Sequence, residues 1–530
     1  MNLPWFATSP RPQPQSRHPW PRRVLAVFLA IAIGTFLWGE PVRADETPVP
    51  STSIQPYLDR VRDGVTEFRL DNGMKFIVLE RQQAPVVSFL IYADVGGADE
   101  PAGQTGVAHY LEHLAFKGSK RIGTTDYEAE KPLLDKLDRL FDDLQTAQAR
   151  RDSEKVAALT AEFERVQLEA SKYVKQNEFG RIVEQAGGVG MNAATSADAT
   201  MYFYSLPANK LELWMSLESE RFLEPVFREF YKEKQVILEE RRLRTDNSPV
   251  GQMIEAFADT AFKVHPYKRP VIGYTEDIQN LTRQNVRDFF ETYYVPNNLT
   301  AAVVGDVDPN RVRELAQTYF GRYPAAPKPP ELDAVEPPQK EIREVTKSLP
   351  SQPWYLEGYH RPAIDHPDHV VYDAIAGILS NGRTSRLYRS LVEQQQLALA
   401  AQGISTYPGD KYANLMLFYA LTAPGHTVDE VAGALRTEID RLKTEPVSAE
   451  ELERVKTQAR ANLLRSLDSS MGMAFALLDY EVKTGTWTNL FKTLEAIEAI
   501  TPADIQRVAR NTFRPENRTV GRLLSRDETN

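Results

Sequence analysis

Polar and apolar positions near residue 65 follow the pattern of β-strands. Residues 66–70 and 75–80 show strand patterns and flank Asp71-Asn72-Gly73, a sequence that favours a hairpin turn. Residues 86–95 form a longer, mostly apolar run that also predicts a strand. Further strand patterns alternate with long helical ones. This alternation predicts an α+β fold of open, mostly antiparallel sheets with helices packed on one face.

The same pattern occurs a second time further along the chain. Residues 281–300 match residues 500–519 without a gap, so that Pro296, for example, corresponds to Pro515, 219 residues later. Each copy predicts a helix, a Pro-Asn turn and a strand. An internal repeat of this kind indicates two homologous α+β halves.

A proline-rich segment separates the two copies. Residues 324–339 have the composition of a semi-rigid, solvated linker. The sequence therefore predicts one domain at residues 65–323 and a second, homologous domain at residues 340–525, preceded by a lead segment at residues 45–64.

One part of the first domain has the period of a coiled coil. Leucines recur at alternating steps of four and three from Leu133 to Leu144, and a second apolar series runs from Val156 to Tyr173. The two series predict an antiparallel helical hairpin, inserted at about residues 123–180. A solvated structural arm is the favoured interpretation, and a contact with substrate or a partner is the alternative.

The first 44 residues have the features of an export signal. Arg22 and Arg23 precede an apolar run at residues 24–38, and the small-x-small sequence Val42-Arg43-Ala44 follows it. The run is shorter than the ~20 residues that span a bilayer comfortably. We expect residues 1–44 to be a signal peptide and the mature protein to be exported to the periplasm or an equivalent space. Retention of residues 24–38 as a membrane anchor is the alternative.

The composition excludes several kinds of chemistry. The chain has 63 basic and 73 acidic residues, a balance that disfavours nucleic acid as a partner. It has no cysteine, and therefore no disulfide, thiolate metal site or cysteine nucleophile. Any metal must be bound by His, Asp or Glu.

The sequence His109-Tyr-Leu-Glu112-His113 carries the strongest indication of function. On a helix, residues four apart lie on one face about one turn apart, so both imidazoles can reach one ion. Glu112 lies on the same side and can hold a water beside the metal. Zinc lowers the pKa of such a water to about 7, and the carboxylate can take its proton. This order of residues is the inverzincin signature. A surface helix with two incidental histidines is the alternative.

A catalytic zinc ion needs a third protein ligand. The helical segment at residues 230–240 offers Glu233 and Glu240, which are seven residues apart and share a face, whereas Glu239 points elsewhere. Taken alone, such a helix is more often a solvated acidic face.

Together, His109 to His113 and Val236-Ile-Leu-Glu-Glu240 resemble the pitrilysin (insulinase) family of zinc peptidases, in the branch of short two-domain chains related to mitochondrial processing peptidase. The resemblance covers nearly all of the mature chain. It implies one zinc ion per chain, bound by His109, His113 and Glu240. It also implies that Glu112 is the general base and that Glu233 supports the site.

The resemblance further implies how substrate binds. Residues 187–196 match a family segment in which Asn192 and Ala193 fall on the edge strand along which the family binds its peptide. Main-chain pairing to an exposed edge accepts only extended chain, so we expect peptides or unfolded protein segments as substrates.

The second domain departs from the family pattern at one place. Residues 385–399 match a segment that commonly bears an Arg and a Tyr seven residues apart, which bind substrate and help to stabilise the tetrahedral intermediate. Val392 and Leu399 occupy those positions here, and neither can donate a hydrogen bond to an oxyanion. We therefore expect a heteromer in which a related subunit supplies Arg and Tyr in trans. A takeover of this role by Arg389 or Tyr407 is the alternative.

The sequence thus predicts a zinc-dependent endopeptidase that acts as the metal-bearing subunit of a heteromer. A non-catalytic or weakly catalytic structural or peptide-binding subunit of the same fold is the alternative.

Overall fold

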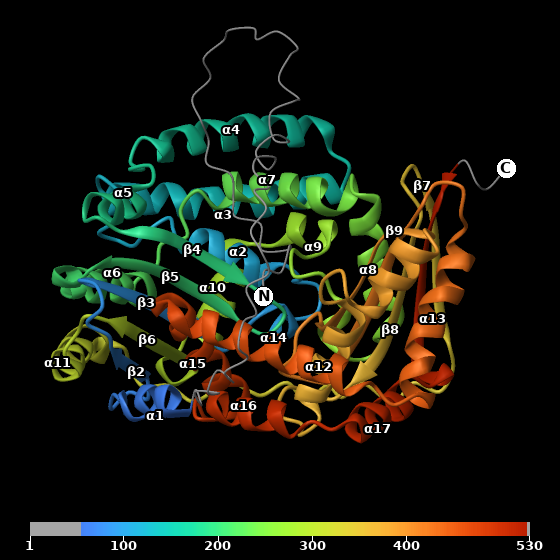
Figure 1. Cartoon of the computed structure of the whole chain (residues 1–530). Helices are drawn as coiled ribbons and strands as arrows, with labels where there is room; N and C mark the ends of the chain where they lie inside the picture. Colours follow the sequence, from blue (N-terminus) through green and yellow to red (C-terminus); the bar gives the residue numbers. More distant parts are fainter. Residues whose placement is uncertain (1–54, 527–530) are drawn as a thin grey trace, which may run out of the picture. The chain divides into compact units, whose positions relative to one another are not determined.

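The computed structural model describes residues 55–526 and contains two β-sheets (Figure 1). The predicted signal peptide at residues 1–44, with its apolar run, lies outside the described residues. Within residues 55–526, no helix is both long enough and apolar enough to cross a membrane.

The first sheet has six strands in the order β1-β2-β6-β3-β5-β4, so β4 is an edge strand. β2 and β6 pair in parallel, and the other neighbours are antiparallel. The strands are β1 (Val65–Arg69), β2 (Lys75–Glu80), β3 (Val86–Ala93), β4 (Val189–Thr195), β5 (Thr200–Pro207) and β6 (Leu299–Gly305).

The second sheet repeats this arrangement without an equivalent of β1. Its order is β7-β11-β8-β10-β9, and only β7 and β11 pair in parallel. Residues 324–340, before this sheet, contain no helix or strand. The predicted class of two mostly antiparallel sheets is therefore confirmed. The strands are β7 (Arg343–Leu349), β8 (Trp354–Arg361), β9 (Ala398–Tyr407), β10 (Asn414–Thr422) and β11 (Arg518–Ser525).

Helices occupy most of the remaining described chain. The first half contains α1 (Gln55–Asp63), α2 (Val107–Leu114), α3 (Tyr127–Ala149), α4 (Ser153–Ser171), α5 (Glu178–Gln185), α6 (Leu211–Leu223), α7 (Phe230–Arg241), α8 (Pro249–Ala261), α9 (Thr275–Asn280), α10 (Arg283–Tyr293) and α11 (Pro309–Tyr319). The second half contains α12 (His369–Ser380), α13 (Val428–Thr444), α14 (Ala449–Asp468), α15 (Ser470–Thr484), α16 (Asn489–Ala499) and α17 (Pro502–Thr512).

The internal repeat is present in the structure in atomic detail. Helix α17 begins and ends 219 residues after α10. Each helix starts with a reciprocal capping box, formed by Thr282 in one half and Thr501 in the other. After each helix, the amide of Asn298 or Asn517 donates to the carbonyl five residues earlier, at 2.9 Å in both halves. The same residue types thus form the same local structure twice.

Each half contributes one helix to the sheet of the other half. Helix α8 packs on β7 and β11, and α15 packs on β3 and β6 (Figure 1). The rings of Phe203 on β5 and Phe475 on α15 meet edge to face, with centroids 4.9 Å apart. A Cβ on Gly358 of β8 would lie 2.8 Å from Phe257 of α8, so only glycine permits this approach. Each sheet is therefore in contact with a helix from the other half of the chain.

The predicted helical hairpin corresponds to α3 and α4, which pack against each other and against α7. The ring of Tyr231 on α7 lies between Phe141 of α3 and Phe163 of α4, with centroid distances of 4.9 and 5.1 Å. Arg283 of α10 binds Asp138 of α3 at 2.7 Å. The hairpin is therefore packed against α7.

Candidate active site

Helix α2 is held at its N-terminus by a buried carboxylate. Glu100 accepts the backbone N–H groups of Gly106, at 2.9 Å, and Ala108, at 3.0 Å. Gly106 has φ +88°, and a Cβ there would lie 2.6 Å from the carbonyl of Ile272. On the core side of α2, the Tyr110 ring stacks on Phe230 of α7 at 4.6 Å. These contacts fix α2 against α7.

This packing brings His109 and His113 of α2 together with Glu240 of α7. One ligand atom of each lies within 4.8 Å of the others, and this is the only such cluster that the described residues contain. The Nε2 atoms of His109 and His113 lie 3.8 and 3.6 Å from the two oxygens of Glu240. Ligand atoms of tetrahedral zinc lie about 3.3–3.5 Å apart, so small side-chain shifts would close this set around the ion. Two imidazoles and one carboxylate suit a catalytic zinc ion.

The two histidines have opposite electrostatic environments. Burial, with the nearby His113 and Arg244, lowers the pKa of His109 well below its usual range, so its ring is neutral and keeps a lone pair for a metal. Burial also acts to lower the pKa of His113, but a hydrogen bond to Glu233 and the surrounding carboxylates raise it overall.

Glu233 orients His113. Its Oε1 lies 3.0 Å from Nδ1 of His113, and its Oε2 lies 2.6 Å from Nζ of Lys117. Burial alone would raise the pKa of Glu233, but His113 and Lys117 lower it to about 2. A carboxylate on Nδ1 leaves Nε2 of His113 free to bind a metal.

The two adjacent glutamates at the end of α7 point in different directions. Glu240 faces the histidines and also pairs with Arg244 at 2.6 Å. Glu239 is exposed and pairs with Arg242 at 2.6 Å. Sequence analysis missed Lys117 and Arg244. Arg244 lies four residues after Glu240, the spacing at which helical side chains meet, whereas Lys117 lies beyond the end of α2 and reaches Glu233 through a long-range contact.

Glu112 lies on α2 between the two histidines. Its Oε2 accepts a 2.7 Å hydrogen bond from the hydroxyl of Thr195, the last residue of β4. Burial raises the pKa of Glu112, and the hydroxyl and backbone of Thr195 act against this rise. Sequence analysis missed Thr195 as a site residue, although it lies in the segment that resembles the family.

The sequence matches peptidase family models in both halves. Residues 76–131 and 149–275 match the model described as insulinase (peptidase family M16), and residues 280–459 match the M16 inactive domain. The chain is 30% identical over 443 residues to the zinc protease PqqE of Helicobacter pylori, which covers 82% of this chain and 86% of that protein. The chain belongs to peptidase family M16. The resemblance to the insulinase family is thereby confirmed.

Other M16 proteins share this architecture. The chain is 23% identical to the mitochondrial-processing peptidase subunit beta of Saccharomyces cerevisiae, over 86% of this chain and 89% of that one. The crystal structure of a protease from Helicobacter pylori superposes with a TM-score of 0.74 and 28% identity, over 87% of this chain and 99% of that one. An M16 inactive domain from Pseudomonas fluorescens, at 13% identity, shares the fold with a TM-score of 0.70, over 87% of this chain and 98% of that one. The family match is interrupted at residues 132–148, within α3.

In this M16 chain, Asn192 and Ala193 lie on β4, at the edge of the first sheet. They pair with Phe203 and Tyr202 of β5 on one side. Among the described residues, no strand pairs with the other side of β4. The structure therefore places both residues on a strand whose second edge is available to an extended chain.

The positions expected to carry Arg and Tyr are in the second half. Val392 lies in the π-helical turn Tyr388–Gln394, partly buried against the second core, and Leu399 lies on β9 with 54% of its surface exposed. Arg389 is an exposed residue of the same turn, and Tyr407 ends β9. Among the described residues, neither Arg389 nor Tyr407 forms a hydrogen bond or ion pair with the histidine cluster.

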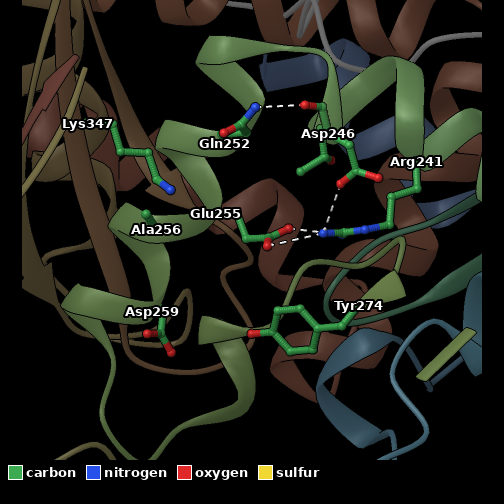
Figure 2. Close-up of a pocket in the computed structure, with 9 residues that line it drawn as sticks. Arg241, Asp246, Gln252, Glu255, Ala256, Asp259, Tyr274 and Lys347 are labelled. Atoms are coloured by element: carbon green, nitrogen blue, oxygen red, sulfur yellow. Dashed lines mark hydrogen bonds and ion pairs between the residues drawn. The ribbon is translucent and has the colours of Figure 1, made fainter. Parts of the chain in front are cut away.

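A cavity of about 510 Å³ is lined by residues of α8, the end of α7 and β7. Figure 2 shows Arg241 in its wall, bound to Glu255 at 2.9 Å and to Asp246 at 3.4 Å. Lys347 of β7 and Tyr274 also line the cavity. His109, His113 and Glu112 are not part of this wall, so the cavity is separate from the histidine cluster.

Proposed function

We propose that this chain is a zinc-dependent endopeptidase whose catalytic residues are those around the histidine cluster. The observation that carries the proposal is the convergence of His109, His113 and Glu240, with Glu112 beside them on α2. Three ligands leave one coordination position open, which is the arrangement of catalytic rather than structural zinc. Relatives named zinc proteases support the same conclusion.

Zinc held by this set would act as a Lewis acid that polarises a water and the scissile carbonyl. Glu112 then takes a proton from the attacking water and delivers it to the nitrogen of the leaving amine as the carbon–nitrogen bond breaks. Glu233 keeps His113 in the tautomer that binds metal. Because Glu112 must accept a proton, its ionised form is the active one.

The proposed substrate is a peptide or an unfolded protein segment. An extended chain that paired with the free edge of β4 beside Asn192 and Ala193 would add a strand to the first sheet. Thr195 ends the same strand and contacts Glu112, so pairing along β4 would bring a peptide bond towards the base.

We further propose that the active species is a heteromer in an exported compartment. Val392 and Leu399 provide no oxyanion donor, and a related chain with Arg and Tyr would supply one in trans. The likeness to a protein named as a peptidase subunit supports this proposal. A non-catalytic subunit is the second candidate, favoured by the missing donors and by the match of residues 280–459 to an M16 inactive domain.

Substitution of Glu112 separates the two candidates. The full chain should bind about one zinc ion, and Glu112→Gln should retain it while cleavage of an unstructured peptide falls by about 10² or more, the contribution typical of a general base. Glu239→Gln, which alters an exposed carboxylate on α7, is the matched control. Cleavage that is the same with and without Glu112 would refute the proposed enzyme.

A further inference from the structure

Thr195 connects the peptide-binding edge with the base. It is the last residue of β4 and pairs with Thr200, the first residue of β5, at the closed end of the hairpin. Side chains two residues apart on a strand point to the same face, so Thr195 and Ala193 share the face that looks towards α2. There the Thr195 hydroxyl donates to Oε2 of Glu112 at 2.7 Å.

The backbone that carries Thr195 is fixed by the turn that follows it. The backbone N–H of Ser196 donates to the carbonyl of Ala199 across the turn at 2.8 Å. The carbonyls of Ser196 and Ala197 accept the N–H groups of Gly97, at 3.0 Å, and Ala98, at 2.9 Å. Those two residues precede Glu100, which caps α2. The turn after β4 and the start of the helix that bears Glu112 are therefore held by one continuous set of hydrogen bonds.

The second half is bonded to the same turn. Asp198, with 3% of its surface exposed, accepts the backbone N–H groups of Asp410, at 2.9 Å, and Lys411, at 3.1 Å. It also accepts the hydroxyl of Tyr267. Asp410 and Lys411 lie in the loop between β9 and β10. A half that carries no metal ligand therefore helps to fix the position of Thr195.

A glutamate side chain has three rotatable bonds and would sample several positions if it were held only by packing. A hydrogen bond to one carboxylate oxygen removes most of this freedom and keeps the group where it can meet a water. Placement errors near 1 Å can cost about a hundredfold in rate. Threonine is suited to this task because its branched Cβ restricts χ1 and so fixes the direction of the hydroxyl.

We propose that Thr195 is a positioning residue that holds Glu112 in its working orientation, on a backbone that Asp198 ties to the second half. This role rests on the function proposed above, because it requires Glu112 to be the base. The edge strand β4 would then have two roles, which are to pair with the peptide and to position Glu112.

The test compares Thr195→Val, Thr195→Ser and Thr200→Val in the full zinc-loaded chain. Valine has the shape of threonine without the hydroxyl, so Thr195→Val should lower kcat about tenfold to a hundredfold. Thr195→Val should not change the zinc content. It should also leave the peptide affinity unchanged when the affinity is measured in chains that carry Glu112→Gln. Thr195→Ser should recover most of the rate. Thr200→Val is the matched control, because the Thr200 hydroxyl donates to the carbonyl of Val95 at 3.0 Å and not to Glu112.

Three outcomes would overturn the role of Thr195. They are an unchanged kcat in Thr195→Val, an equal loss of kcat in Thr200→Val, and a loss of peptide affinity or zinc in proportion to the loss of rate. Failure of the proposed function gives a different result, because Glu112→Gln would then cleave peptide as well as the unmodified chain.

Discussion

Nδ1 of His113 lies 3.0 Å from Oε1 of Glu233, and the other oxygen of that carboxylate lies 2.6 Å from Lys117. This contact fixes the ring of His113 with Nε2 directed at Glu240. A carboxylate partner also makes an imidazole a better metal ligand, because it stabilises the positive charge that the ring gains on binding.

We therefore expect Glu233→Gln to weaken zinc binding about tenfold to a hundredfold without abolishing it. The carboxylate of Glu233 accepts hydrogen bonds from both His113 and Lys117, and an amide is a weaker acceptor for this pair. Competition with a chelator measures the affinity directly. Glu229→Gln is a suitable control, since Glu229 also faces Lys117, at 3.5 Å, but makes no recorded bond to a histidine. Unchanged affinity in Glu233→Gln would show that His113 does not need this partner.

Glu240 and Glu239 should differ sharply as zinc ligands. Glu240 faces both histidines, whereas Glu239 is exposed and bound to Arg242. Glu240→Gln should lose both the metal and the peptidase activity, because a neutral amide oxygen is a much weaker ligand than a carboxylate. Glu239→Gln should keep about one zinc per chain. Metal analysis of the two purified variants is sufficient, and the reverse result would place the ligand one residue earlier.

Local sequence patterns predicted the parts of the site that lie on single helices. The i, i+4 spacing of His109 and His113 and the seven-residue spacing of Glu233 and Glu240 each place two side chains on one helical face, and the structure has them there. The internal repeat was equally predictable, because each copy contains its own cap, turn and strand. In these cases the interacting residues are close in sequence.

Long-range contacts could not be predicted in this way. Thr195 and Glu112 are 83 residues apart, and no periodicity connects a strand end with a helix face. The packing of α8 on the second sheet and of α15 on the first sheet was missed for the same reason. The pattern of an amphipathic helix does not indicate which sheet the helix will contact. Only an unusual residue such as Gly358, in a strand where glycine is unfavourable, hints at the close approach of Phe257.

Asp99, in the 3-10 helix Gly97–Asp99 before α2, should make the protein less stable as the pH rises. Burial, only partly offset by the N–H of Gly96 and by Lys411, raises the pKa of Asp99 from 3.8 to about 7. The folded state then binds a proton between about pH 4 and 7 that the unfolded state has released, so the free energy of unfolding falls with increasing pH across this window. One pKa unit corresponds to about 1.4 kcal/mol.

Asp99→Asn should remove this part of the pH dependence. The amide oxygen can still accept from Gly96, at the 2.8 Å recorded for Asp99, and no charge is buried above pH 7. Thermal unfolding of zinc-free protein at pH 5 and pH 8 should show a smaller difference for the variant than for the unmodified chain. An identical difference would mean that Asp99 is already ionised at pH 5.

The last prediction concerns the partner subunit. Val392 and Leu399 occupy the positions at which an oxyanion donor is expected, and loss of one such donor typically costs about 10² to 10³ in rate. The isolated chain should therefore bind zinc yet cleave peptides slowly, and a related chain that carries Arg and Tyr should raise kcat.

Two variants of the isolated chain test this prediction. The exposed single substitution Leu399→Tyr, at a position with 54% exposure, and the double substitution Val392→Arg with Leu399→Tyr should both raise its activity. Because Val392 packs against the second core, the exposed single variant keeps the test informative if the double variant is unstable. Arg389→Ala and Tyr407→Phe test the alternative within this chain. Full activity of the isolated chain, lost in either of these two variants and unaffected by Leu399→Tyr, would show that no partner is needed.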